Sequence, residues 1–321
     1  MKQKVVVFSQ IDSQILTRLS EQFELLQVNP KQGDVNQQIR DMVADADGMI
    51  GAGRLLNEDN LKTAKKLKII SSVSVGYDNY DLKYLKQQGI CLTHTPHVLT
   101  ETTADLAFTL LLSAARQVPK LDAWVKAGQW KRTVSHAHFG QDVFGKTIGI
   151  VGMGNIGAAI ARRAFHGFNM SVLYHSRSEY PIIAQSVNAE YCGLNDLLQR
   201  ADFVVLAVDL NPSSQALIAK PQLDLMKPTA VLVNIARGAV LDEQALVQAI
   251  REGKIFAAGL DVYQHEPLAQ SELFELDQVV TLPHIGSATE ETRFKMAELA
   301  YQNLVLGLAG KQPNFVVDHV E

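Results

Sequence analysis

In the amino-terminal third of the chain, short apolar runs alternate with stretches in which apolar residues recur at helical spacing. The first run, at 4–9, is rich in β-branched residues, and apolar positions at the spacing of a helix follow it. Similar short runs recur at 48–51, 67–72 and 90–93. Because strands that alternate with helices pair in parallel, this region predicts an open α/β sheet whose ligands meet the carboxyl ends of its strands. Residues 74–79 lie at one such end.

The rest of the chain repeats this pattern. Apolar runs that predict strands lie at 147–151, 171–175, 203–207, 230–234, 255–260 and 279–282. Helical patterns separate several of them, and a long helix at 290–308 is expected to return the chain to the first domain. The predicted fold class is therefore α/β, with two doubly wound parallel-sheet (Rossmann-like) domains and a cleft between them.

The segment between the two predicted sheets has its own pattern. Pro96 interrupts strand character, and Thr100 begins a helix that runs to about Ala115 and is apolar on most sides. Such a helix suits burial between domains or subunits. Residues 118–145 contain both tryptophans of the chain but little periodicity. We expect this segment to be an arm that packs on the second subunit of a homodimer, and a surface loop packed on itself is the alternative.

The first strand of the second sheet breaks into the sequence G-x-G-x-x-G and continues as a helical pattern. Gly152 permits a tight turn, Gly154 lets the backbone approach a pyrophosphate, and Gly157 lets the helix pack on the strand. The N–H groups of the first helical residues, Asn155 and Ile156, would face the anion. The stretch therefore predicts a dinucleotide site, and a tight turn without a ligand is the alternative.

The residues after the next strand bear on the choice of nicotinamide cofactor. An Asp or Glu about 20 residues beyond the glycines binds the free ribose 2′-hydroxyl of NAD. Here that position holds His175, Ser176 and Arg177, and a hydroxyl beside a planar cation suits the 2′-phosphate of NADP. The sequence favours NADP(H), with NAD(H) as the second choice. In the alternative, Arg177 is a solvated surface arginine and Glu179 or a backbone group serves the ribose.

Composition limits the classes of function. The chain has 321 residues, enough for two domains, and a net charge of −4 without long blocks of either sign, which argues against a nucleic-acid partner. It has no apolar run of membrane-spanning length and no signal-peptide pattern, so we expect a soluble, cytoplasmic protein with no membrane partner. Cys91 and Cys192 are expected to be free thiols. His94 and His97 suggest a metal pair, but the intervening proline spoils regular geometry and no metal is expected.

Unusual polar residues follow three of the predicted strands, in the stretches 235–238, 259–267 and 282–287. Together with the glycine turn, these stretches closely resemble the D-isomer-specific 2-hydroxyacid dehydrogenase family, and the resemblance runs the length of the chain. Within that family the sequence is most similar to the glyoxylate/hydroxypyruvate reductase branch, which includes bacterial 2-ketogluconate reductases. The segments that carry this closer similarity lie at 74–79, 98–105, 152–157 and 284–289. One departure is His94, where that branch more often carries an asparagine.

The resemblance implies a catalytic set of three residues, with His284 as the acid/base, Glu266 as its partner and Arg237 as the cation that anchors the substrate. Reduction of a 2-keto acid needs a proton for the carbonyl oxygen, and an imidazolium supplies one near neutral pH. A carboxylate on the other ring nitrogen would fix the tautomer and favour the charged ring. An arginine can bond both the substrate carboxylate and the polarised carbonyl.

The resemblance also implies binding residues. Backbone N–H groups of Val75 and Gly76 are expected to hold the substrate carboxylate together with Arg237 and His284. Beyond the glycine turn and the residues after the second strand, cofactor contacts are expected at Thr103, Ala236, Asp261 and Ser287. In this interpretation Asp261 lies near the nicotinamide amide.

Taken together, these features predict an NADP(H)-preferring enzyme that reduces glyoxylate, hydroxypyruvate or 2-ketogluconate to D-2-hydroxy acids by hydride transfer. Residues 1–98 with 288–321 are expected to bind the substrate and residues 99–287 the dinucleotide, and the cleft is expected to close and exclude water. An enzyme similar to D-3-phosphoglycerate dehydrogenase is an alternative, although no basic cluster for a phosphate is identified. A dinucleotide-sensing, corepressor-like binding protein is a second alternative.

Overall fold

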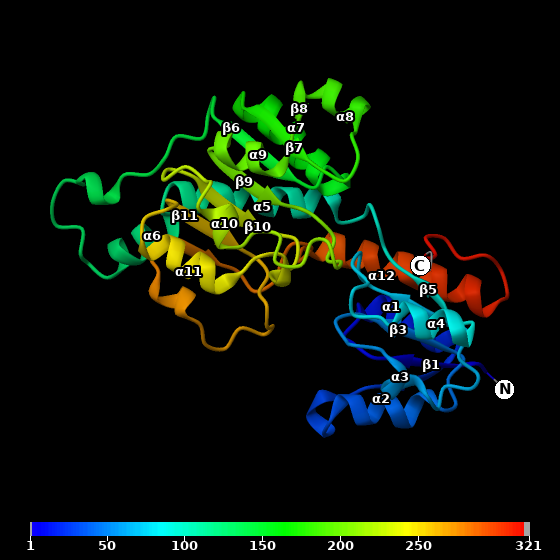
Figure 1. Ribbon diagram of the computed structural model, residues 1–321. Helices are drawn as coiled ribbons and strands as arrows, with labels where there is room; N and C mark the ends of the chain where they lie inside the picture. The colour runs from blue at the N-terminus through cyan, green and yellow to red at the C-terminus, as the bar shows by residue number, and fades with distance from the viewer. Residues whose placement is uncertain (1, 318–321) are drawn as a thin grey trace. The chain divides into compact units, whose positions relative to one another are not determined.

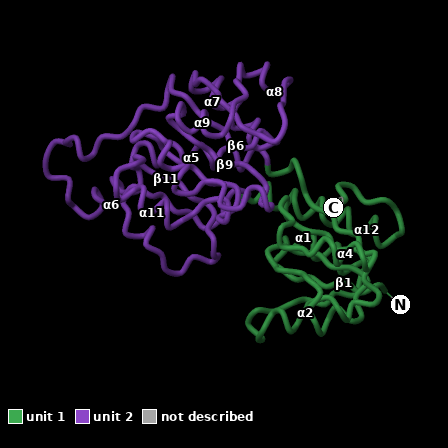
Figure 2. The backbone as a smooth tube through the Cα atoms, in the orientation of Figure 1, with its two compact units in different colours: residues 1–99, 288–321 green, residues 100–287 purple. Residues whose placement is uncertain are grey.

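The computed structural model describes residues 2–317, which form two compact units (Figure 2). One unit contains the described residues up to Leu99 and from Ala288 onward, and the other is Thr100–Ser287. None of the helices between residues 2 and 317 has the length and hydropathy of a membrane span. Which unit binds substrate and which binds the dinucleotide stays a prediction.

The first unit is built on a parallel sheet with the strand order β2-β1-β3-β4-β5 (Figure 1). Its strands are β1 (Lys4–Val7), β2 (Glu24–Gln27), β3 (Gly48–Gly51), β4 (Ile69–Ser72) and β5 (Cys91–Thr93). Its helices are α1 (Ser13–Gln22), α2 (Val35–Val43), α3 (Glu58–Leu61), α4 (Leu82–Gln88) and α12 (Glu290–Leu308), with a 3-10 turn η1 (Pro30–Gln32). The inner strands β3 and β4 are buried throughout, as expected for a sheet covered on both faces. Edge strand β2 is largely exposed and lacks an apolar run, so the sequence pattern does not predict it.

The last helix, α12, packs on this first sheet. A Cβ atom added to Gly48 in β3 would lie 2.9 Å from the Leu304 side chain, and one added to Gly307 would lie 2.5 Å from the Ile69 side chain. Helix and sheet therefore approach closely where glycine stands on one side of the contact. The helix returns the chain to the first sheet, as the sequence predicts.

Between Thr100 and Ser287 the second unit contains a parallel sheet with the strand order β12-β11-β10-β9-β6-β7-β8. Its strands are β6 (Thr147–Val151), β7 (Ser171–His175), β8 (Ala189–Tyr191), β9 (Phe203–Leu206), β10 (Val231–Asn234), β11 (Ala257–Leu260) and β12 (Val279–Thr281). Its helices are α5 (Thr100–Ala115), α6 (Val118–Lys126), α7 (Asn155–Phe168), α8 (Pro181–Ser186), α9 (Leu194–Arg200), α10 (Lys220–Leu223) and α11 (Glu243–Arg251), with 3-10 turns η2 (His136–His138), η3 (Gly238–Val240) and η4 (Glu272–Glu275). The predicted fold class, two parallel α/β sheets, is confirmed.

Helices cover both faces of the second sheet (Figure 1). Helices α5 and α7 pack on one face around an apolar core that includes Phe108, Ile160 and Val233. Helices α9, α10 and α11 pack on the other. Because α5 contacts α7 on one side and β10 and β11 on another, it is apolar over most of its surface, which explains its sequence pattern. Short strand β8 is partly exposed, and the apolar pattern does not predict it.

The glycine turn joins β6 to α7 at the point where the strand order reverses between β6 and β9. Gly152 has a φ of +104°, and a Cβ atom there would lie 2.5 Å from the carbonyl oxygen of Ala207. A Cβ atom at Gly157 would lie 2.0 Å from the carbonyl oxygen of Gly152. The strand and the helix can therefore meet only because both positions lack a side chain.

We predict that Gly157→Ala destabilises the second unit by about 1–3 kcal/mol, because the added methyl group overlaps a backbone carbonyl. Gly167→Ala in the same helix is the matched control, since a Cβ atom there meets nothing within 4 Å. The control should keep its stability or gain up to about 1 kcal/mol. Urea unfolding followed by circular dichroism measures both variants, and equal stability would contradict the close packing of turn and helix.

Candidate active site

A hydrogen-bonded pair of side chains lies beyond the carboxyl ends of β11 and β12. His284 Nδ1 is 2.7 Å from Oε2 of Glu266. Because an ionised carboxylate only accepts hydrogen bonds, Nδ1 carries a hydrogen and Nε2 is the ring nitrogen left for a ligand. The His284 side chain is 48% exposed, so the imidazole is open to a reactant. The structure brings these two predicted catalytic residues together.

The loop after β11 holds the carboxylate in place. Oε1 of Glu266 accepts a hydrogen bond of 2.9 Å from the backbone N–H of Tyr263. The phenol of Tyr263 in turn donates to the carbonyl oxygen of Leu282, at 2.9 Å, just before the loop that carries His284. Tyr263 therefore connects the Glu266 carboxylate to the chain segment that precedes His284. Its own pKa is raised by burial, which keeps the phenol in its donor form.

The charges around Glu266 keep it ionised. Its partial burial alone would raise the pKa of the carboxyl group, but the hydrogen bonds from His284 and Tyr263 lower it. The positive charges of His284 and Arg237 lower it further, and the net result is a pKa below the ordinary value of 4.5. At neutral pH Glu266 is thus a carboxylate, and it accepts the hydrogen bond from Nδ1 of His284.

Arg237 follows β10 in a loop that a buried asparagine shapes. The fully buried Asn234 accepts a hydrogen bond from the N–H of Ala236 and donates one to the carbonyl oxygen of Arg237, both at 3.0 Å. A Cβ atom at the next residue, Gly238, would lie 1.8 Å from the backbone of Tyr263. The loops after β10 and β11 therefore pack directly on each other, which brings Arg237 within electrostatic reach of Glu266.

Asp261 and Thr103, both predicted to contact the cofactor, hold the backbone next to His284. Asp261 is 2% exposed, and its carboxylate accepts hydrogen bonds from the N–H groups of Ile285, at 2.7 Å, and Gly286, at 2.8 Å. The Thr103 hydroxyl donates to the carbonyl oxygen of Gly286 at 3.0 Å.

These contacts fix the segment in which His284 adopts a left-handed φ of +53°. Burial raises the pKa of Asp261, opposed by the two backbone hydrogen bonds and the charge of His284. Ser287 lies partly exposed just beyond this segment. The cofactor role predicted for these residues stays a prediction.

The start of α7 presents an open surface. Gly154 is exposed, and a Cβ atom there would meet nothing within 4 Å, unlike at Gly152 and Gly157. Within residues 2–317, no side chain caps the first turn, where Asn155 is exposed and Ile156 partly exposed. The backbone N–H groups of this turn are therefore available to an anion.

Ser176 and Arg177, at the end of β7, differ in how they are held. Oγ of Ser176 accepts a hydrogen bond of 2.8 Å from the N–H of Met153 in the glycine turn. The carbonyl oxygen of Ser176 accepts one of 3.1 Å from the Tyr191 phenol. Arg177 is exposed, and no residue in 2–317 hydrogen-bonds to its side chain or pairs with its charge. Its guanidinium is available to a ligand at the edge of the glycine turn.

In the first unit, residues 74–76 form a loop after β4, and each of their carbonyl oxygens accepts a hydrogen bond. The carbonyl oxygen of Ser74 accepts from the N–H of Thr95 at 2.9 Å, and that of Val75 from Nδ1 of His94 at 2.9 Å. The carbonyl oxygen of Gly76 accepts from the Ser74 hydroxyl at 2.6 Å. No acceptor in 2–317 is found for the N–H groups of Val75 and Gly76, so these amides are free to bind an anion.

The two histidines considered as a metal pair have other contacts. His94 bonds to the backbone as described, and the ring of His97 packs on Phe315 with the centroids 5.7 Å apart. Residues 2–317 contain no group of three His, Cys, Asp or Glu side chains that could hold a metal ion.

Comparison with known proteins identifies the family. The model for the NAD-binding domain of D-isomer specific 2-hydroxyacid dehydrogenases matches residues 108–286. A glyoxylate/hydroxypyruvate reductase B from Klebsiella pneumoniae is 45% identical over 311 residues, which cover 97% of this chain and 96% of that protein. The chain belongs to the D-isomer specific 2-hydroxyacid dehydrogenase family. The predicted resemblance is confirmed, and the protein is an NAD(P)-dependent oxidoreductase.

Solved structures of this family match over almost the whole chain. A crystal structure of a Thermus thermophilus protein has a TM-score of 0.89 and 40% sequence identity, and covers 98% of this chain and 99% of its own. An NADPH-dependent glyoxylate/hydroxypyruvate reductase from Sinorhizobium meliloti, solved with NADP and malonate, has a TM-score of 0.88 and 31% identity. That match covers 99% of this chain and 98% of the other.

In each of the two units, sequence reasoning did not anticipate the residues that support the candidate binding or catalytic residues of that unit. Tyr263 acts partly through its backbone N–H, which leaves no mark in a sequence. Asn234 is visible in the sequence, because it is a polar residue at the end of an otherwise apolar buried strand. The hydroxyls of Ser72, Ser74 and Tyr80, which brace the loop after β4, stand in a polar cluster at the end of an apolar run.

We predict that Glu266→Gln lowers thermal stability at neutral pH and that the difference from wild type shrinks as pH falls. A carboxyl group with a lowered pKa in the folded state stabilises the fold above its ordinary pKa of 4.5, and this stabilisation is lost as pH falls through the lower folded-state value. Differential scanning calorimetry between about pH 7 and about pH 3.5 measures it. Glu275→Gln, at an exposed pair with Arg251, is the control. A pH-independent difference would contradict the charge argument.

Proposed function

We propose that this dehydrogenase reduces small 2-keto acids, glyoxylate and hydroxypyruvate first among them and 2-ketogluconate as a further candidate, to D-2-hydroxy acids by hydride transfer. In this proposal, residues 99–287 bind the dinucleotide and residues 1–98 with 288–321 bind the substrate. The observation that carries it is the 2.7 Å hydrogen bond between Glu266 and His284, with the charge of Arg237 nearby. The names of the Klebsiella and Sinorhizobium relatives support the substrate class.

The proposed roles follow from the geometry of the pair. Reduced nicotinamide, when bound, supplies the hydride that reaches the keto carbon. His284 gives a proton from Nε2 to the carbonyl oxygen, because Nδ1 is engaged by Glu266. Glu266 favours the charged imidazole before that transfer and holds the ring in orientation. The Arg237 guanidinium binds the substrate carboxylate and stabilises negative charge on the carbonyl oxygen.

Val75 and Gly76 are proposed to bind the substrate carboxylate through their N–H groups. Two adjacent donors without an acceptor in 2–317 match the two oxygens of a carboxylate. The carbonyl oxygens of residues 74–76 each accept a hydrogen bond from another group, so their negative charge is directed toward those donors. The loop is therefore suited to an anion.

The proposed cofactor is NADP(H), with NAD(H) as the second choice. The open surface at Gly154 and the uncapped first turn of α7 fit a pyrophosphate. Arg177, whose side chain pairs with no residue in 2–317, offers its guanidinium for a 2′-phosphate, and Ser176 is its neighbour in the sequence. The Sinorhizobium relative was solved with NADP, which supports this preference. Ala236, Thr103, Asp261 and Ser287 remain proposed cofactor contacts.

We also propose that the protein is cytoplasmic, because that compartment keeps thiols such as its two free cysteines reduced.

We further propose that the protein forms a homodimer through the arm at 118–145. This arm extends from the second unit and carries large apolar side chains that solvent reaches. They are Val118, Val125, Trp130, Val134, Phe139 and Phe144. Such a concentration of exposed apolar surface is typical of an interface.

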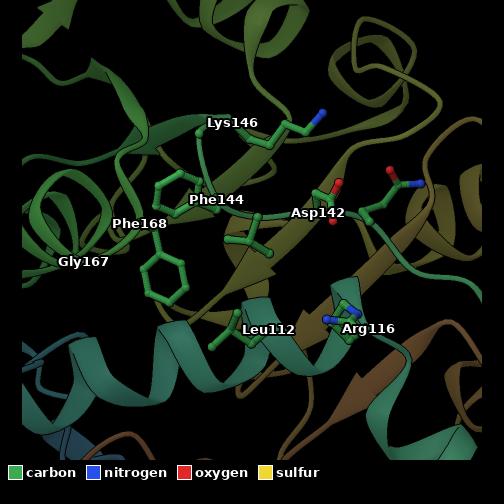
Figure 3. Close-up of a pocket in the computed structure, with 10 residues that line it drawn as sticks. Leu112, Arg116, Asp142, Phe144, Lys146, Gly167 and Phe168 are labelled. Atoms are coloured by element: carbon green, nitrogen blue, oxygen red, sulfur yellow. The ribbon is translucent and has the colours of Figure 1, made fainter.

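A cavity of about 750 Å³ lies at the base of this arm (Figure 3). In Figure 3, Leu112 and Arg116 rise from α5 toward the segment that carries Phe144 and Lys146, with Phe168 alongside. Lys146 immediately precedes β6, so the cavity stands at the amino end of that strand. The proposed catalytic residues follow the carboxyl ends of strands, so the cavity is separate from them. Through Phe144, which is one of its lining residues, it borders the arm that we propose as the subunit interface.

Turnover tests the proposed reaction. Loss of reduced-nicotinamide absorbance is measured with glyoxylate and with hydroxypyruvate, using NADPH and NADH in parallel. We expect turnover with both substrates, faster with NADPH, and a fall of at least about 100-fold in kcat for His284→Ala, since general acid catalysis contributes that much. Cofactor binding without substrate-dependent oxidation would contradict the proposal and favour a dinucleotide sensor.

Arg177→Ala separates cofactor preference from activity. If the guanidinium binds the 2′-phosphate, the variant loses about tenfold in kcat/KM with NADPH and little with NADH, as expected for a charge-assisted contact. Arg40→Ala, a surface arginine bound to Gln37, is the matched control. An equal effect of Arg177→Ala on both cofactors would overturn the assignment.

Analytical ultracentrifugation tests the proposed dimer. Wild type should sediment at twice the 35.3 kDa of one chain. Phe144→Asp, which places a charge at a residue that is 69% exposed, should shift the protein toward monomer at micromolar concentration. Ile182→Asp is the control, because that residue is 86% exposed and lies outside the arm. A dimer that withstands Phe144→Asp would speak against this interface.

A further inference from the structure

An imidazole bonds to the loop that is proposed to bind the substrate carboxylate. His94 immediately follows β5, and its Nδ1 atom is 2.9 Å from the carbonyl oxygen of Val75. The ring of Tyr77 packs edge-on against the imidazole, with the centroids 5.6 Å apart. Two contacts, with Val75 and with Tyr77, therefore hold the side chain of His94.

The contact determines which ring nitrogen carries the proton. A backbone carbonyl oxygen only accepts hydrogen bonds, so Nδ1 of His94 must be the donor. The neutral ring is then the Nδ1–H tautomer, and Nε2 has no hydrogen. Within residues 2–317, no other donor to the carbonyl oxygen of Val75 is found.

This hydrogen bond acts on one of the two free amides. The carbonyl of Val75 and the N–H of Gly76 belong to the same planar trans peptide, so they point in opposite directions. A donor on the carbonyl oxygen fixes the plane of that peptide and thus the direction of the N–H. It also polarises the amide and makes the N–H a stronger donor.

We propose that His94 is a positioning residue for the substrate carboxylate, acting through the peptide that joins Val75 to Gly76. The inference rests on the proposed function, because it assigns the Gly76 N–H to the carboxylate. The other two carbonyls of the loop have separate donors, the backbone N–H of Thr95 and the hydroxyl of Ser74. His94 is thus the side chain that sets the orientation of this particular amide.

The remaining hydroxyls brace the loop independently of His94. Tyr80 donates to Ser72 at 2.9 Å, and Ser72 lies 2.7 Å from Ser74, whose own hydrogen goes to the carbonyl oxygen of Gly76. Burial raises the pKa of Tyr80 to about 12, so the phenol stays a donor. Loss of the imidazole should therefore release one peptide plane and leave the rest of the loop in place.

The structure also suggests which residue can replace the imidazole. Nδ2 of an asparagine is separated from Cα by the same number of bonds as Nδ1 of a histidine, and it carries hydrogens. His94→Asn can therefore donate to the Val75 carbonyl oxygen, whereas His94→Leu fills a similar volume without a donor. This pair separates the hydrogen bond from the packing of the ring.

Steady-state kinetics with glyoxylate and saturating NADPH test the proposal. His94→Leu should raise the KM for glyoxylate about fivefold to tenfold, the effect of one hydrogen bond, with kcat within about twofold and the KM for NADPH unchanged. His94→Asn should stay within about twofold of wild type in all three constants. His166→Leu, at an exposed histidine of α7, controls for removal of an imidazole. An unchanged KM in His94→Leu, or an equal rise in His94→Asn, overturns the proposal.

A spectroscopic measurement keeps the test decisive if His94→Leu fails to fold. Imidazole ¹⁵N chemical shifts of the wild-type enzyme, assigned with His94→Asn, should show a protonated Nδ1 and an unprotonated Nε2 in the neutral ring. The opposite tautomer overturns the proposal. Failure of the proposed function is distinguishable, because wild type would then reduce no 2-keto acid, whatever the state of His94.

Discussion

Parallel pairing is the constraint on which the rest of this structure depends. All strands of a parallel sheet run in one direction, so the loops that follow them leave from one edge. In the second unit, those loops carry the glycine turn after β6, Ser176 and Arg177 after β7, and the three proposed catalytic residues after β10, β11 and β12. The sheet thus gathers residues that are more than a hundred positions apart in the sequence.

Buried groups hold the exposed ones within that edge. Asp261, Asn234 and the backbone of Tyr263 form hydrogen bonds to main-chain or carboxylate atoms, and Asp261 and Asn234 are almost inaccessible to solvent. His284 and Glu266, which Asp261 and Tyr263 support, remain open, and Arg237, in the loop that Asn234 shapes, is partly exposed. This division is physically reasonable, because a buried hydrogen bond is stronger than an exposed one while a reacting group needs access to its substrate.

Much of this arrangement follows from the sequence. The apolar runs predict the inner strands, and the G-x-G-x-x-G stretch predicts the turn in which Gly152 and Gly157 would clash with backbone atoms if they carried side chains. Two edge strands, β2 and β8, are too exposed to leave an apolar pattern. At the site, the pairing of Glu266 with His284 was predicted by resemblance, but the hold of Asp261 on residues 285 and 286 was not. Hydrogen bonds to backbone atoms depend on the folded path of the chain and are invisible in residue identities.

Ser176 and Arg177 show how one turn can combine a fixed part with a replaceable one. The Ser176 side chain is tied to the backbone of the glycine turn, so exchanging it disturbs the fold. Arg177 points into solvent and supports nothing else in 2–317. We therefore expect substitutions at this arginine to be nearly neutral for folding. If Arg177 binds the 2′-phosphate as proposed, natural selection or protein engineering could change coenzyme use there without first having to rebuild the domain. On the proposed role of Arg177, a change in a single codon would then suffice for the enzyme to draw on the other nicotinamide coenzyme.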